Sequence, residues 1–405
     1  MTWRDIALGS AIHVKHGFAF KGEYFADHGE YIVLTPGNFN EEGGFRVRPE
    51  KERYYASDIP ESYVLDEGDL IVAMTEQGAG LLGSAALVPQ AKRYLHNQRL
   101  GLVDQIDTAL LDKKFLYLLF NTRSVRAQIS GSASGTKVRH TAPERIYRVS
   151  VRVPDIPTQC QIAETVLAYD DLIENNRRRM TLLEDSARLH YREWFVRLRF
   201  PGYEHTRITD GVPKGWKRKT LGDLTSFLKR GITPTYDDDA EGLVINQKCI
   251  RESRVNLEFG RHQSKEVKPE RLVQRGDVLV NSTGEGTLGR VAQLKTPLSN
   301  CTVDTHVTIV RPDKSVATHY FGLAVMDWEP RFSTMGKGAT NQTELSPATI
   351  GEAQITLPSR TLLDQFELFV EPIYEQITNL TLQNQKLRTA RDLLLPHLMS
   401  GELAV

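Results

Sequence analysis

The chain of 405 residues, with a mass of 45.8 kDa, is too long for one ordinary hydrophobic core and suits two domains plus connectors. Its 51 Lys and Arg residues balance its 51 Asp and Glu residues, which excludes a generic polycation that binds nucleic acid by charge alone. No stretch approaches about 18 consecutive apolar residues, the first residues lack a signal-peptide pattern and the 3 cysteines are scattered. We therefore expect a cytoplasmic protein with neither a disulfide framework nor a CxxC zinc site.

The first strongly apolar strand that the sequence predicts belongs to a segment that is later repeated. Gly68–Val72 (GDLIV) is typical of a buried strand and recurs as Gly276–Val280 (GDVLV). Further along the register becomes constant, and Pro154 stands 204 residues before Pro358. A repeat of about half the chain indicates a tandem duplication.

Each copy has the same predicted order of elements. About 150 residues of short strands and turns end in an alternating strand, at 149–154 and at 353–358, and a long helix follows each. Strands that precede a terminal helix indicate α+β globules rather than a doubly wound sheet. We therefore divide the chain into a first globule, a spacer helix, a second globule and a final helix with its tail, at 1–154, 155–200, 201–358 and 359–405.

Both predicted helices carry residues alternately four and three positions apart, which is the seam pattern of a coiled coil. We expect the first helix to begin after Thr158 and to end before Pro201, at a length of ~60 Å. Pro372 should kink or restart the second helix, and Pro396 should end it. The predicted seam positions are Ile162, Val166, Tyr169, Ile173, Asn176, Met180, Leu183, Phe366, Val370, Ile373, Ile377, Leu380, Asn384 and Leu387.

The seam of each helix needs a partner, and the simplest partner is the helix of the other copy. Two globules with a helix after each would then close into a pseudo-twofold dumbbell with antiparallel helices. The polar seam residues Asn176 and Asn384 would fix the register. The alternative is that each helix packs only on its own globule.

The glycine-rich segments 78–83 and 284–289 match the GxGxxG pattern of dinucleotide-binding loops. Strand-like sequence follows each of them, whereas such a loop must open a helix, so we interpret both as structural hairpins or DNA contacts. The chain has no GxxxxGK phosphate loop, no GxSxG elbow, no HExxH motif and no Asn-Pro-Pro-aromatic signature of amino-methyltransferases. We therefore predict neither a catalytic residue nor a metal site.

Several local strings and the order of the segments resemble the specificity subunits of type I restriction–modification systems. The strings are His16–Lys21 (HGFAFK), the Gly-Asp-aliphatic strand Gly68–Val72, the helix entry Pro154–Ile162 and the tail Leu393–Leu403. The likeness extends over nearly the whole chain, and the duplication with helices at half-chain spacing is its specific part. The second copy departs from the pattern, since Lys229–Pro234 stands where a Gly-Phe-Ala-Phe string would be.

The resemblance implies that each globule is a target recognition domain that reads one half of a bipartite, asymmetric DNA site. The helix pair would be a spacer that sets the gap, and ~60 Å spans roughly 18 base pairs. Two methylase subunits would bind around the helices and supply S-adenosylmethionine for adenine-N6 methylation. Restriction subunits, where present, would add ATP- and Mg-dependent cleavage. The flipped adenine would enter the methylase, so this chain would be a non-catalytic DNA-binding subunit.

Polar, flexible loops recur in both globules, and Arg, Lys, Asn and Gln are the side chains that reach base edges. For each single residue, an ordinary solvated loop is the alternative. The residues predicted to contact bases or phosphates are Phe18, Lys21, Thr75, Gln77, Lys92, Arg93, Asn97, Arg99 and Lys137 in the first globule, and Arg230, Thr233, Asn246, Lys248, Thr283, Glu285, Thr340, Asn341 and Gln342 in the second.

Two other functions stay open from the sequence. One is a stand-alone DNA methyltransferase or fused nuclease with degenerate motifs, which would bind S-adenosylmethionine by itself. The other is a coiled-coil scaffold with two peptide-binding globules, which would depend neither on DNA nor on a methylase.

Overall fold

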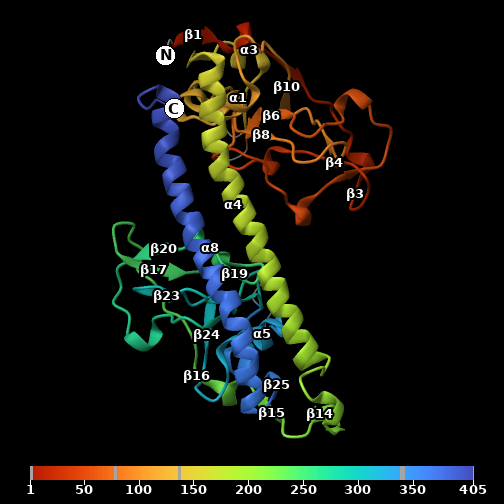
Figure 1. Ribbon diagram of the computed structural model, residues 1–405, viewed down its shortest axis with the longest axis vertical. Helices are drawn as coiled ribbons and strands as arrows, with labels where there is room; N and C mark the ends of the chain where they lie inside the picture. Colours follow the sequence, from red (N-terminus) through yellow and green to blue (C-terminus); the bar gives the residue numbers. More distant parts are fainter. Residues whose placement is uncertain (1–2, 77–79, 136–137, 338–342, 405) are drawn as a thin grey trace. The chain divides into compact units, whose positions relative to one another are not determined.

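The computed structural model describes residues 3–76, 80–135, 138–337 and 343–404 (Figure 1). Its contacts divide the chain into two units. Unit 1 comprises Met1–Ile173 and Lys386–Val405, and unit 2 comprises Glu174–Gln385. Each unit therefore contains one globule and a section of each long helix. The finer division into four separate domains stays a prediction.

The globule of unit 1 is a chain of short strands with a few helices between them. In sequence order its elements are β1 (Arg4–Ala7), β2 (Ile12–His16), β3 (Phe25–Ala26), β4 (Ile32–Val33), β5 (Tyr54–Tyr55), β6 (Leu70–Ala73), β7 (Thr75–Glu76), β8 (Ala85–Leu87), β9 (Tyr94–Leu95), β10 (Leu100–Ile106), α1 (Lys113–Phe120), α2 (Arg123–Gly131), β11 (Arg139–His140), α3 (Pro143–Tyr147) and β12 (Ser150–Val153).

The core of unit 1 lies between a central antiparallel sheet, in the order β2-β10-β6-β8, and the helices α1 and α2. Val72 of the sheet, Phe115 of α1 and Ile129 of α2 are buried in this cluster. Helix α1 begins where it does because the Asp112 carboxylate accepts the backbone N–H of Phe115 at 2.8 Å. A smaller sheet, β3-β5-β4-β9, lies beside it, and β1 pairs with β12.

The globule of unit 2 is likewise a chain of short strands with a few helices between them. In sequence order they are β13 (Ile208–Thr209), β14 (Val212–Pro213), β15 (Lys217–Thr220), β16 (Thr225–Arg230), β17 (Gly242–Ile245), β18 (Ile250–Arg251), β19 (Arg254–Val255), β20 (Arg261–Gln263), β21 (Val278–Asn281), β22 (Val291–Gln293), β23 (Cys301–Val303), β24 (Val307–Pro312), α5 (Thr318–Met326), α6 (Glu329–Phe332), α7 (Pro347–Gly351) and β25 (Gln354–Leu357).

The central sheets of the two units have the same topology, which confirms the duplication. The order β16-β24-β21-β22 repeats β2-β10-β6-β8, and the pair β15–β25 repeats β1–β12. The parallel pair β17–β23 repeats the parallel pair β4–β9. Each glycine-rich segment is followed by a strand, β8 or β22, as the sequence predicts. The α+β class is confirmed.

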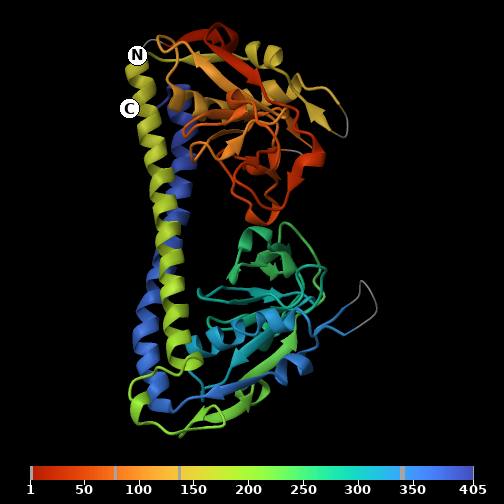
Figure 2. The same ribbon diagram turned by 90° about the vertical axis from the view of Figure 1, so that its right-hand side faces the viewer.

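The two long helices are α4 (Ile156–Tyr191), which passes into a π-helical turn at Arg192–Val196, and α8 (Arg360–Ser400). Within each unit their sections lie side by side and antiparallel (Figure 2). In unit 1 Arg391 pairs with Asp170, and in unit 2 Asn176 bonds Asn384. The alternative of helices packed only on their own globules is therefore wrong. Among the described residues, no helix combines the length and apolar character needed to cross a membrane.

The prolines limit the helices less than the sequence suggests. Helix α4 already includes Pro157, because the missing N–H of a proline does no harm in a first turn. The restart expected at Pro372 as the alternative to a kink and the end expected at Pro396 are both wrong, since α8 continues through them. Pro372 is exposed, and so is Leu368, whose carbonyl loses its partner and can bond water instead. Beyond Pro396, burial of Leu398 in the unit 1 core holds the last turn.

Candidate nucleic-acid interface

The central sheet of unit 2 brings several chain segments together at one of its ends. Arg230, the last residue of β16, pairs with Thr308 of β24. Asn281, the last residue of β21, pairs with Val307 at the start of the same strand. The segments that leave the sheet after Arg230 and Asn281, and the turn before Val307, therefore lie next to one another.

Backbone hydrogen bonds join these segments outside the sheet. The N–H of Ile232 donates to the carbonyl of Val303 at 3.0 Å, and the N–H of Ser282 donates to that of His306 at 2.8 Å. The N–H of Leu345 donates to the carbonyl of Ser282 at 2.8 Å, which adds a fourth segment. We call the residues 230–233, 282–287, 304–306 and 343–345 the unit 2 loop cluster.

Unit 1 contains the same cluster, bond for bond. The N–H of Phe18 donates to the carbonyl of His96 at 2.8 Å, and the N–H of Met74 donates to that of Arg99 at 2.9 Å. The N–H of Thr141 donates to the carbonyl of Met74 at 2.9 Å. We call the residues 17–18, 74–76, 96–99 and 139–141 the unit 1 loop cluster. The same backbone frame thus carries different side chains in the two units.

A glycine permits the close approach of two segments in each cluster. A Cβ added to Gly17 would lie 2.0 Å from the carbonyl oxygen of Asn97, and one added to Gly231 would lie 1.8 Å from that of Val303. Real Cβ atoms do not come so near to backbone oxygens, so a side chain at either position would push the segments apart. The sequence shows both glycines, but not what they approach.

Each cluster contains a threonine paired with a histidine. Thr75 Oγ1 lies 3.1 Å from Nδ1 of His140, and Thr283 Oγ1 lies 2.7 Å from Nδ1 of His306. The histidines come from different segments, 139–141 in unit 1 and 304–306 in unit 2. Both pairs combine groups that can donate and accept, which is the chemistry that hydrogen-bonds base edges. Beside His306, burial raises the pKa of Asp304, which accepts the His306 N–H at 2.9 Å.

A buried carboxylate that the sequence did not single out supports the unit 1 loop cluster. Glu76 accepts the backbone N–H groups of Leu81 and Leu82 at 2.9 and 2.8 Å, and it pairs with Arg139 at 3.2 Å. It therefore joins the end of the glycine-rich loop to the segment that carries His140. A charged residue three positions after the apolar strand β6 was the signal that could have revealed it.

The predicted contact residues are distributed over all classes of exposure. Exposed ones are Lys21, Lys92, Arg99, Thr233, Lys248 and Glu285; half-buried ones are Phe18, Arg93, Arg230, Asn246 and Thr283; buried ones are Thr75 and Asn97. Outside the described residues lie Gln77, Lys137, Thr340, Asn341 and Gln342. The segments that form the loop clusters include Phe18, Thr75, Asn97 and Arg99 in unit 1, and Arg230, Thr233, Thr283 and Glu285 in unit 2.

Other predicted contact residues lie outside the clusters or are already engaged. Lys92 and Arg93 precede β9, whereas the cluster begins after its end. Asn246 caps a short helix, accepting the Lys248 N–H at 2.8 Å. Inside the unit 2 cluster, Arg230 forms an ion pair with Glu344. For all of these residues, contact with DNA stays a prediction.

The predicted seam residues of α4 and α8 are all buried or half-buried. In the middle of the seam between the two helices, the Asn176 side-chain amide donates to Oδ1 of Asn384 at 2.9 Å and to Oε1 of Gln383 at 3.2 Å. The Thr381 hydroxyl donates to the sulfur of Met180 at 3.4 Å. A buried amide pair is satisfied in only one alignment, so these contacts oppose sliding of the helices.

One group of potential metal ligands lies away from the clusters. His319, Glu367 and Glu371 offer atoms within 4.8 Å of one another. However, Glu371 already bonds Nε2 of His319 at 2.6 Å and pairs with Arg275 at 2.8 Å. Within the described chain, Nδ1 of His319 has no hydrogen-bond partner, whereas a metal-bound histidine normally donates from its second nitrogen. These residues form a polar link between α5 and α8.

Comparisons with known proteins agree with this architecture. Residues 1–185 match the family model described as "Type I restriction modification DNA specificity domain". The chain is 24% identical over 305 residues to the MjaIX type I restriction enzyme specificity subunit of Methanocaldococcus jannaschii, covering 72% of this chain and 69% of the relative. It is 23% identical over 364 residues to the HindI specificity subunit of Haemophilus influenzae, covering 72% and 77%.

The fold has a counterpart among solved structures. The S subunit of a type I restriction–modification system from M. genitalium aligns with a TM-score of 0.61 and 16% identity, covering 98% of this chain and 96% of that one. The protein therefore has the two-unit fold of an S subunit. The family-model match over residues 1–185 and the curated relatives make the chain similar in sequence to type I restriction–modification specificity subunits.

Proposed function

We propose that this chain gives a type I restriction–modification complex its DNA sequence specificity, each loop cluster reading one half of a bipartite site. The observation that carries the proposal is the repeated cluster. The backbone bonds around Phe18 and Met74 recur around Ile232 and Ser282, while the side chains differ. Two loop clusters with the same backbone arrangement but different side chains are suited to recognise two half-sites of different sequence.

The long helices have the properties of a spacer in this proposal. At about 1.5 Å per residue, the 36 residues of α4 extend ~54 Å. Their central amide pair, Asn176–Asn384, holds one alignment. The helices would set the gap between half-sites and dock two methylase subunits. Their outer faces offer exposed Leu172, Leu182 and Leu393 for such contacts.

The chemistry would belong to the partners. The methylase subunits would bind S-adenosylmethionine and methylate an adenine N6 in each half-site, taking the flipped base into their own pocket. Restriction subunits, where present, would use ATP and Mg. This chain would contribute recognition and spacing without a catalytic residue, and its balanced total charge leaves much of the DNA clamp to the partners.

The proposal is tested by mapping N6-methyladenine across the genome of the native host with and without the gene. Loss of one bipartite motif with a fixed gap is the expected result. An unchanged methylation pattern, in cells where a methylase co-purifies with this chain and is active, would contradict the proposal. Binding of S-adenosylmethionine by the purified chain alone would favour a stand-alone methyltransferase instead.

A further inference from the structure

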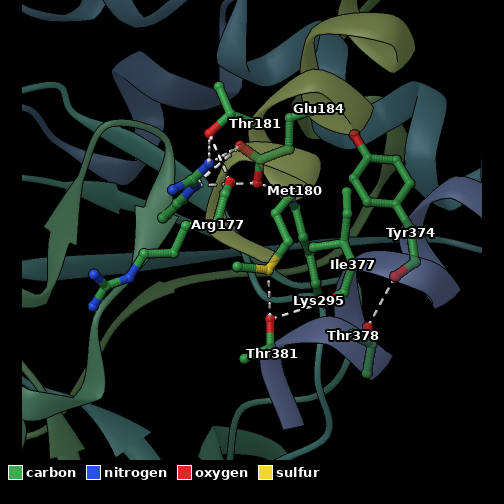
Figure 3. A network of polar contacts seen from close by, with 10 residues as sticks. Arg177, Met180, Thr181, Glu184, Lys295, Tyr374, Ile377, Thr378 and Thr381 are labelled. Carbon is green, nitrogen blue, oxygen red and sulfur yellow. Dashed lines mark hydrogen bonds and ion pairs between the residues drawn. The ribbon is translucent and has the colours of Figure 1, made fainter. Parts of the chain in front are cut away.

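The carboxylate of Glu184 on α4 accepts hydrogen bonds from two cationic side chains of the unit 2 globule (Figure 3). Glu184 is buried, at 7% exposed. It accepts hydrogen bonds from Arg254 Nη2 at 2.7 Å and from Arg254 Nε at 3.0 Å, and a third from Lys295 Nζ at 2.7 Å. Arg254 begins β19, and Lys295 follows β22. Arg254 also donates to the hydroxyl of Thr181, one turn earlier on α4, at 3.1 Å.

The cluster reaches the second long helix as well. Lys295 Nζ lies 4.9 Å from the ring centroid of Tyr374 on α8, and this ring is buried. Burial opposes ionisation of Glu184, but Lys295 and Arg254 outweigh it and lower the pKa of Glu184. Both helix sections of unit 2 and two parts of its globule thus meet at one charged group.

The Glu184–Arg254–Lys295 cluster contributes a fixed orientation between helix and globule more than it contributes stability. A buried ion pair costs so much desolvation that apolar residues of similar size often stabilise a protein equally well. A carboxylate held by a guanidinium at two atoms and by an ammonium is satisfied in one orientation only. In the second copy, Arg388 stands at the position equivalent to Glu184, 204 residues later, so the carboxylate is not repeated there.

We propose that Glu184 is a positioning residue that fixes the orientation of the unit 2 globule on its own helix sections. It would thereby restrict the gap at which the second half-site is read. This inference rests on the proposed function, because it names what determines the spacing of the same recognition site. Arg254 and Lys295 are its partners in the globule.

The test uses the chain co-expressed with its methylase partner, and duplexes that carry the mapped motif with the native gap or a gap one base pair longer or shorter. The main variant replaces the cluster by apolar residues, with Glu184→Leu, Arg254→Met and Lys295→Met together. A second variant, Glu184→Asp, keeps the charge and shortens the side chain. The matched control is Glu174→Gln on the exposed face of the same helix.

The apolar variant should melt within a few degrees of the wild type and lose at least tenfold of its preference for the native gap. Glu184→Asp should lose less, and Glu174→Gln should retain the full preference. Wild-type gap preference in both a stably folded apolar variant and Glu184→Asp would overturn the inference. If Glu184→Asp alone can be purified, its gap preference decides.

Failure of the proposed function gives a different result, since the wild type would then methylate no bipartite motif. In that case hydrogen exchange still tests the positioning role. The β18–β19 amides should exchange at least tenfold faster in Glu184→Asp than in Glu174→Gln. Equal exchange in the two variants would contradict the inference.

Discussion

Acidification should weaken unit 1 through one buried histidine, His96. Its side chain is fully buried, and its Nε2 lies 2.9 Å from the carbonyl of Leu100. Within the described chain, Nδ1 has no hydrogen-bond partner. A second proton would therefore add both a charge and an unsatisfied donor to the interior. Burial lowers the pKa of His96 from 6.5 to about 4.

The lowered pKa of His96 determines both the direction and the size of the change in stability with pH. The unfolded chain takes up the proton near pH 6.5, whereas the folded chain resists it until about pH 4. Stability is therefore complete above pH 6.5 and falls as the pH drops towards 4. The pKa values of His96 in the unfolded and folded chain differ by about 2.5 units, which corresponds to ~3 kcal/mol in the free energy of unfolding. This is on the order of 100-fold in the equilibrium constant for opening of the surrounding structure.

Hydrogen exchange of the β10 amides is the assay, with wild type and His96→Gln compared at each pH so that intrinsic exchange cancels. Glutamine can still donate to the Leu100 carbonyl but cannot be protonated in this range. The protection of the wild type relative to the variant should fall on the order of 100-fold between pH 6.5 and 4. The exposed His28→Gln, in the same unit, serves as control and should follow the wild type. A constant ratio for His96→Gln would refute the reasoning.

Two further predictions concern the glycines and the helix seam. Gly17→Ala and Gly231→Ala should each lower the melting temperature and reduce methylation at least tenfold, because the new Cβ meets a backbone carbonyl, whereas Gly22→Ala has open space around it and should behave as wild type. Equal activity of the three variants would show that the close approach does not matter. Replacing Asn176 and Asn384 together by leucine should raise the melting temperature by several degrees, since a buried polar pair costs stability, and should weaken the preference for one gap. A lower melting temperature with an unchanged gap preference would be inconsistent with a register role.

Much of the fold could be predicted because it depends on local pattern. The seam of α4 and α8 is visible as a repeat of four and three, and the apolar runs at β6 and β21 mark central strands. The effect of Pro372 could not be predicted, because it depends on which helix face meets solvent. The sequence alone does not show which face of a helix is exposed, because that depends on what the helix packs against.

The candidate interface was less accessible to sequence reasoning. Thr75 and Thr283 lie in equivalent places, but their histidine partners come from different segments that only the fold brings near. Glu184 and Lys295 are 111 residues apart, and no local pattern connects them. Residue type suggested polar loops correctly. The sequence could not show, however, that the Asn246 side chain accepts a hydrogen bond from the backbone N–H of Lys248 in its own unit.

The central claim is that each unit reads its own half of the site. It is tested most directly by exchanging residues 337–345, which include one segment of the unit 2 loop cluster, for the corresponding residues of another specificity subunit and mapping N6-methyladenine again. The account predicts a new sequence in one half-site, with the other half-site and the gap unchanged. A change in both half-sites would contradict it.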